Sequence, residues 1–143
     1  MTADQLKDNG VIYFEHVRQG LENYHSEIRK MDGAEACRLF LDMWNRRGRN
    51  DAFLDFYYYR LDGETRLKAE SVLTDEQKEY LKKIEPDNNI VIFPMDELLL
   101  RIAVRLNETA MLFSTVYFSG SAAESRSTWW GNYNQEYIVF TDK

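Results

Sequence analysis

The stretch NIVIFPMDELLLRIAVRLNETAMLFSTVYF, residues 89–118, sets the pattern of this fold. Residues 89–93 are a short apolar run closed by a proline, which predicts a strand. Asp96 precedes apolar residues at helical spacing, and it predicts the N-cap of a helix over 96–107. Residues 111–118 predict a second strand. If the two strands are parallel, this segment is a crossover unit with a right-handed connection.

Helices are expected upstream of this stretch. Thr2-Ala3-Asp4-Gln5 resembles a capping box, so a short helix should begin there and be interrupted at Gly10. From Val17 to Met31, apolar residues recur at steps of four, three, four and three, which predicts one continuous amphipathic helix. Asp32-Gly33-Ala34-Glu35 predicts the N-cap of a strongly apolar helix that ends in Arg46-Arg47-Gly48.

The aromatic segment from Phe53 to Leu61 predicts a change from helix to strand. Asp62-Gly63 follows it and is a strong hairpin signal, so we expect strands over 53–61 and 64–70. A helix through 53–60 is the alternative, because the apolar residues of this segment also fit helical spacing.

Downstream, a second capping box and one more strand complete the pattern. Thr74-Asp75-Glu76-Gln77 predicts a helix that stops before Pro86, and residues 136–140 predict a strand. Helices followed by a sheet with later helices favour an α+β fold, with N-terminal helices packed on a small antiparallel or mixed sheet of about 4–5 strands. Because the chain has no repeat, low-complexity tract or linker, we expect residues 1–143 to form a single domain.

The composition predicts a soluble, acidic protein. A chain of 143 residues with 44% hydrophobic residues can bury a substantial core. The net charge of −6 makes nucleic-acid binding unexpected, because phosphate neutralisation needs clustered Lys and Arg. Residues 1–8 lack the basic and apolar regions of a secretory signal, and the apolar stretch at 98–106 is too short to span a bilayer. We therefore expect a cytoplasmic protein without membrane contact.

The sequence contains no common catalytic motif: it has no phosphate-binding loop, no nucleophile elbow and no zinc-protease helix. His16 and His25 should fall on opposite faces if the first long helix is continuous, with His25 bordering the core, so they cannot share a metal or a proton. Cys37 lies in the most apolar predicted helix and is expected to be a small buried hydrophobe. We expect no catalytic residue, no metal site and no cofactor.

The only concentrated basic patch consists of Arg46, Arg47 and Arg49. It is a candidate anion-binding site, because the guanidinium group matches carboxylates and phosphates in shape and charge. The alternative is that these arginines only interact with the carbonyl end of the helix that precedes them.

Two aromatic features are candidate partner-binding surfaces. In a strand over 53–61, Tyr57 and Tyr59 would point to the same face, which is either covered by a helix or bound by a partner. The second feature follows a small, polar run at 119–128 that we expect to be a loop. Adjacent tryptophans in an extended chain point opposite ways, so one should pack inward while the other anchors a partner. This second candidate set is Trp129, Trp130, Tyr133 and Asn134.

Two functional hypotheses follow from these patterns. The first is a small binding or inhibitor protein, namely a bacterial immunity-type protein that neutralises a partner toxin, for example a basic nuclease. It rests on the acidic surface, the aromatic surplus and the missing catalytic set. The second is a small enzyme or ligand-binding domain with a carboxylate-lined pocket between sheet and helices, drawing on Asp55, Glu64, Glu70 and Glu136.

Overall fold

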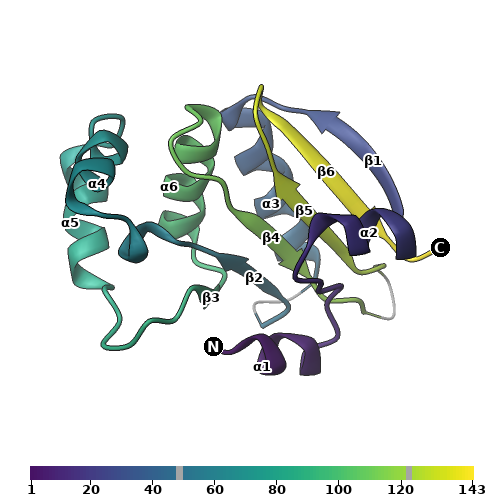
Figure 1. The fold of residues 1–143 in the computed structure, drawn as a ribbon. Helices are drawn as coiled ribbons and strands as arrows, with labels where there is room; N and C mark the ends of the chain where they lie inside the picture. The colour runs from purple at the N-terminus through teal and green to yellow at the C-terminus, as the bar shows by residue number, and fades with distance from the viewer. Residues whose placement is uncertain (48–49, 122–123) are drawn as a thin grey trace.

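A computed structural model describes residues 1–47, 50–121 and 124–143. These residues form a six-stranded sheet in the order β1-β6-β5-β4-β2-β3, in which every neighbouring pair is antiparallel (Figure 1). The α+β class is confirmed, and the sheet has six strands rather than the expected four or five. The strands are β1 (His25–Lys30), β2 (Ala52–Asp55), β3 (Ile92–Pro94), β4 (Thr115–Phe118), β5 (Ser127–Gly131) and β6 (Glu136–Thr141).

The helices are distributed unequally over the two faces of the sheet. The described helices are α1 (Ala3–Asp8), α2 (Val17–Asn23), α3 (Gly33–Arg47), α4 (Gly63–Glu70), α5 (Asp75–Lys83) and α6 (Glu97–Glu108), together with the short 3₁₀ helix η1 (Tyr58–Arg60). In Figure 1, α3 and α6 lie side by side behind the sheet, and α4 and α5 continue this layer beyond the β3 edge. The N-terminal part of the chain, with α1 and α2, lies on the opposite face. We call this opposite face the open face.

Alternation along the strands assigns each side chain to a face. In β4, Val116 and Phe118 belong to the main core beneath α3 and α6, whereas Tyr117 belongs to a second, smaller cluster on the open face. Trp129 of β5 packs under α3, where the Phe40 ring meets it edge to face at a centroid distance of 5.3 Å. The strand β4 therefore contributes to two different environments.

The predicted continuous helix over 17–31 is wrong. The helix α2 ends at Asn23, and residues 25–30 pair along their whole length with β6, from His25 opposite Thr141 to Lys30 opposite Glu136. The cross-strand hydrogen bonds outweigh the helical periodicity, because intrinsic propensity is a weak preference that tertiary pairing overrides. His25 is consequently exposed on an edge strand and does not border the core, while His16 is the N-cap residue of α2.

The predicted hairpin over 53–70 is also wrong, and so is the alternative helix over 53–60. The strand β2 ends at Asp55, the chain turns through η1, and Asp62 becomes the N-cap of α4 by accepting a hydrogen bond from Thr65 N at 2.8 Å. An aspartate before a helix satisfies one of the free N–H groups of its first turn. The Asp-Gly pair therefore starts a helix here instead of forming a hairpin turn.

The remaining helices begin where their capping signals predict. Capping boxes at Thr2 and Thr74 open α1 and α5, and Asp96 caps α6. Asp32 accepts a hydrogen bond from Glu35 N at 2.8 Å in the first turn of α3. The strands around α6, β3 and β4, run in the same direction because both are antiparallel to β2, which lies between them. Within the described ranges, no helix has the length and apolar character needed to cross a membrane.

Candidate functional site

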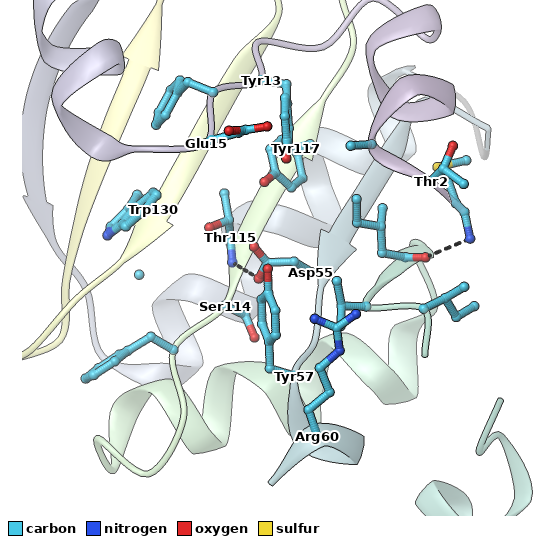
Figure 2. Close-up of a pocket in the computed structure, with 18 of the residues that line it drawn as sticks. Thr2, Tyr13, Glu15, Asp55, Tyr57, Arg60, Ser114, Thr115, Tyr117 and Trp130 are labelled. Atoms are coloured by element: carbon cyan, nitrogen blue, oxygen red, sulfur yellow. Dashed lines mark hydrogen bonds between the residues drawn. The ribbon is translucent and has the colours of Figure 1, made fainter. Parts of the chain in front are cut away.

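A cavity of about 580 Å³ opens on the open face of the sheet. It lies where β2, β4 and β5 meet the N-terminal segment and the residues that lead into β3 (Figure 2). We call it the tyrosine pocket and define it by Tyr13, Asp55, Tyr57, Tyr117 and Trp130. Its volume lies within the range of about 300–1,000 Å³ that small-molecule sites occupy.

Strand register brings the floor of the tyrosine pocket together. Leu54 of β2 pairs with Val116 of β4, so the next residue, Asp55, lies beside Thr115. Thr115 in turn pairs with Trp130 of β5. Because Leu54 and Val116 face the helices, their neighbours Asp55 and Thr115 face the opposite way, into the pocket.

Asp55 is the central polar group of the pocket. Its Oδ1 accepts a hydrogen bond from the backbone N–H of Thr115 at 2.7 Å. Burial disfavours the charged carboxylate and raises the pKa of Asp55 from 3.8 to about 7, although the hydrogen bond from Thr115 acts in the opposite direction. Near neutral pH the side chain therefore exists in both protonation states.

Three tyrosines surround this carboxyl group. In Figure 2, the hydroxyl groups of Tyr13, Tyr57 and Tyr117 point into the space around Asp55. Burial is the main cause that raises the pKa of each of these phenols, and the negative charge of Asp55 adds to the effect. All three hydroxyl groups are consequently protonated at neutral pH and can both donate and accept hydrogen bonds.

Aromatic rings and a second carboxylate complete the side of the pocket nearest β5. Phe14 stacks on Trp130 with a centroid distance of 6.1 Å and an interplanar angle of 16°. Glu15 follows Phe14 in the N-terminal segment, and its carboxylate extends toward Tyr13 and Tyr117 (Figure 2). Glu15 is exposed, so the pocket has one carboxyl group at its floor and another at its mouth.

Two cations lie on the opposite rim, and each already has a partner. The Arg60 guanidinium lies 5.8 Å from the centre of the Tyr57 ring and donates to the backbone oxygen of Asn89 at 2.6 Å. The amino group of Met1 donates to the backbone oxygen of Ile92 at 3.3 Å. These contacts hold both positive charges at the edge of the pocket.

Ser114 adds a buried hydroxyl group without a partner. Ser114 lines the pocket with only 5% of the residue exposed, and its Oγ has no hydrogen-bond partner in the described part of the chain. Buried polar groups are normally satisfied, so an unpartnered hydroxyl in a pocket wall is a place where a ligand or water would bind.

The structure separates the aromatic residues that the sequence grouped together. Tyr57 and Trp130 line the tyrosine pocket. Tyr59 and Trp129 instead pack in the main core, where the Tyr59 hydroxyl donates to the Leu81 carbonyl oxygen at 2.6 Å. The prediction that one tryptophan packs inward and the other outward is confirmed, because Trp129 is 4% exposed whereas Trp130 is only partly buried, on the open face.

Tyr133 and Asn134 lie in the turn between β5 and β6. Tyr133 is 62% exposed and meets Phe113, a pocket residue, edge to face at 4.6 Å. Asn134 adopts a left-handed conformation with φ of 62°, which asparagine tolerates well. Tyr133 therefore stands next to the mouth of the pocket, and Asn134 shapes the turn.

The arginine patch is engaged in internal contacts. The Arg47 side chain is 3% exposed and donates to the backbone oxygens of Met43, Ser119 and Ser125 at 2.6–3.3 Å. Arg46 pairs with Glu124 at 3.1 Å. Arg49 lies outside the described residues. The observed contacts favour a structural role for Arg46 and Arg47 over anion binding.

Of the four carboxylates proposed for a shared pocket, Asp55 alone lines this one. Glu70 accepts a hydrogen bond from the Tyr58 hydroxyl at 2.6 Å, Glu64 is in the first turn of α4, and Glu136 begins β6. The second carboxylate is Glu15, which sequence reasoning missed, as it missed Tyr13 and Tyr117. These residues carry no local motif, and only the fold of the N-terminal segment over the sheet brings them to Asp55.

Within the described ranges, no group of three or more His, Cys, Asp or Glu side chains is placed to hold a metal ion. Cys37 is partly buried against the main core, and burial raises the pKa of its thiol. Comparison of the chain with protein-family models, curated proteins and solved structures found no match.

Proposed function

We propose that this protein acts by binding, and that the tyrosine pocket is its recognition site. One observation carries the proposal: the Asp55 carboxyl group and three tyrosine hydroxyl groups converge on a cavity of about 580 Å³ on the open face. Concave sites with aromatic walls and a few convergent polar groups are the usual form of small-ligand sites. The cytosol is the proposed place of action.

The make-up of the pocket favours binding over catalysis. A nucleophilic mechanism needs a nucleophile within hydrogen-bond reach of a base, and the residues that line this cavity include no histidine, cysteine or lysine. Asp55 has a pKa of about 7, which suits acid–base chemistry, but the hydrogen bond it accepts comes from the backbone N–H of Thr115, which is not a proton-transfer group. The sequence suggested either a small enzyme or a ligand-binding domain with a carboxylate-lined pocket. Of these two, the ligand-binding domain has the better support.

The proposal is tested by detecting a bound small molecule and locating it. Native mass spectrometry of the full chain with small-molecule extracts should show an adduct. Amide signals of Asp55, Thr115 and Gly131 should shift in NMR spectra when the ligand is added. Combining Tyr57→Ala with Trp130→Ala should abolish the adduct, because these rings form two walls of the pocket while contributing little to the main core.

Glu76→Gln is the matched control, because Glu76 is exposed in the first turn of α5, far from the pocket. This variant should keep the adduct. Shifts that map away from the pocket, or an adduct that survives the double substitution, would contradict the proposal.

Inhibition of a partner toxin by protein contact, as immunity-type proteins do, is a second candidate function. Exposed aromatic residues at the mouth of the pocket favour it: Tyr133 is 62% exposed and Tyr57 is 39% exposed. The net charge of −6 would speed association with a basic partner. Tyr133→Ala should weaken such a complex, and raising the salt concentration should slow its formation. A complex unaffected by both changes would rule out this surface.

A further inference from the structure

We propose that the ligand of the tyrosine pocket is an organic cation, a guanidinium or alkylammonium group bound between the carboxylates of Asp55 and Glu15. This inference rests on the proposed binding function and names the chemical class that the site accepts. The group can belong to a free metabolite or to an arginine or lysine side chain of a protein, since both present the same chemistry.

The first argument is the balance of hydrogen-bonding groups. Ionised carboxylates only accept hydrogen bonds, and the carboxyl groups of Asp55 and Glu15 both line the cavity. The tyrosine hydroxyl groups around them can accept as well. A guanidinium group offers five donors and an ammonium group three, so either one matches a cavity rich in acceptors.

The second argument is that this chain already binds cations on the rings of the pocket. Arg60 lies over Tyr57 at 5.8 Å, and the Lys7 ammonium lies over Tyr13 at 5.2 Å. Both contacts are cation–π interactions at the edge of the site. A ligand cation inside the pocket would meet the same kind of aromatic surface, with the stacked pair of Phe14 and Trp130 as a further wall.

The third argument concerns the alternative, an anionic ligand. An anion at the centre of the cavity would lie against Asp55 and Glu15. Of the cations at the edge of the site, Arg60 and the Met1 amino group are bonded to backbone oxygens, and the Lys7 ammonium lies over the Tyr13 ring. The positions of these charges therefore favour a cation.

Binding of a cation should depend on pH through Asp55. The ionisable groups that face it are Tyr13 and Glu15 from the N-terminal segment, Tyr57 and Arg60 from the η1 region, Tyr117 from β4, and the Met1 amine. Of these, the tyrosines stay protonated near pH 7 because burial raises their pKa. A bound cation stabilises the Asp55 carboxylate, so binding releases a proton. Affinity should increase as the pH rises through about 7 and then level off.

The experiment measures the binding of three small probes to the full chain. The probes are similar in shape and differ in charge. Butylguanidinium is the cation, butylurea its neutral counterpart and pentanoate the anion. NMR shifts of the Trp130 indole N–H and the Thr115 amide report binding at the pocket. We expect only butylguanidinium to shift these signals at millimolar concentration. Its affinity should fall about tenfold or more in Asp55→Asn and lose its pH dependence there.

Two further variants and a peptide pair sharpen the test. Glu15→Gln should weaken binding by about two- to fivefold, because Glu15 is exposed, and the control Glu76→Gln should change nothing. A capped peptide with a central arginine, compared with its citrulline counterpart, separates the two sources of the cation. Binding of the arginine peptide supports a protein ligand, whereas binding of butylguanidinium alone supports a free metabolite.

The remaining outcomes separate this inference from the proposed function. If butylurea or pentanoate shifts the pocket signals as strongly as butylguanidinium, the cation inference is overturned and binding at the pocket stands. If the affinity for butylguanidinium is unchanged in Asp55→Asn, the cation inference is likewise overturned and binding at the pocket stands. If no probe of any charge shifts these signals, the cation inference fails, and a missing adduct in native mass spectrometry would then overturn the binding function itself.

Discussion

The backbone N–H of Thr115 donates to the side chain of Asp55 at the point where β2 leaves β4. Up to Leu54 the two strands pair through their backbones. Two residues later, the Phe56 N–H donates to the Val91 carbonyl oxygen on the β3 side at 2.6 Å, while the Asp55 carboxyl group satisfies the Thr115 N–H. The Asp55 carboxyl group therefore has two roles. It accepts the hydrogen bond at the end of the β2–β4 pair, and it lies at the floor of the tyrosine pocket.

The ionisation of Asp55 should make the protein less stable as the pH rises. Its folded pKa of about 7 lies above the usual value of 3.8, so the folded state binds the proton more tightly than the unfolded chain does. The free energy of unfolding should therefore decrease between about pH 4 and pH 7, by an amount on the order of 2–4 kcal/mol. Urea unfolding at a series of pH values measures this.

Asp55→Asn should flatten that dependence, because an amide does not ionise and its oxygen can still accept from Thr115. At pH 8 the variant should be more stable than the wild type, while at pH 4 the two should be similar. Glu76→Gln, the control, should follow the wild-type curve. The same pH dependence of stability in Asp55→Asn as in the wild type would mean that the pKa of Asp55 is not raised.

The two adjacent tryptophans should differ sharply in their contribution to stability. Trp129 is 4% exposed and packs in the main core, so Trp129→Ala should cost about 3–5 kcal/mol. Trp130 is partly exposed and stacks on Phe14, so Trp130→Ala should cost about 1–2 kcal/mol and reduce ligand binding. Denaturant unfolding of both variants gives the comparison, and equal losses would contradict the assignment of the two rings to opposite faces.

Arg47 should be needed for stability and Arg46 should not. Arg47→Ala would remove a charged donor from the backbone oxygens of Met43, Ser119 and Ser125, the first two of them partly buried, at a cost of about 2–3 kcal/mol. The Arg46 side chain is 52% exposed and forms a surface ion pair, so Arg46→Ala should cost less than about 1 kcal/mol. Thermal unfolding in low and high salt measures both. If phosphate stabilises the wild type but not these variants, the anion-binding interpretation regains support.

Gly131 should not tolerate a side chain. A Cβ at this position would overlap Oδ1 of the buried Asn107 and approach the Ser114 carbonyl oxygen at 2.7 Å. Gly131→Ala should therefore destabilise the protein by about 1–3 kcal/mol and disturb the pocket wall at Ser114. Gly63→Ala is the control: a Cβ there would meet nothing within 4 Å, and the position opens α4, so the variant should be neutral or slightly stabilised. Chemical denaturation distinguishes the two.

Local signals in the sequence determined where most helices begin. Side chains such as Thr2, Thr74 and Asp96 bind N–H groups within three residues of themselves, so their effect can be predicted without knowledge of the rest of the chain. The opposite orientation of Trp129 and Trp130 is equally local, because it follows from the geometry of an extended backbone.

The tertiary structure alone decided the conformation at 25–30 and the composition of the pocket. Residues 25–30 become a strand because β6 supplies partners more than a hundred positions away. Asp55 meets Tyr13, Glu15 and Tyr117 only after β2 and β4 pair and the N-terminal segment covers them. Sequence patterns report interactions between near neighbours in the chain. A cavity is instead built from residues that are distant in the chain, and its charge and pKa values depend on burial that exists only once the chain has folded.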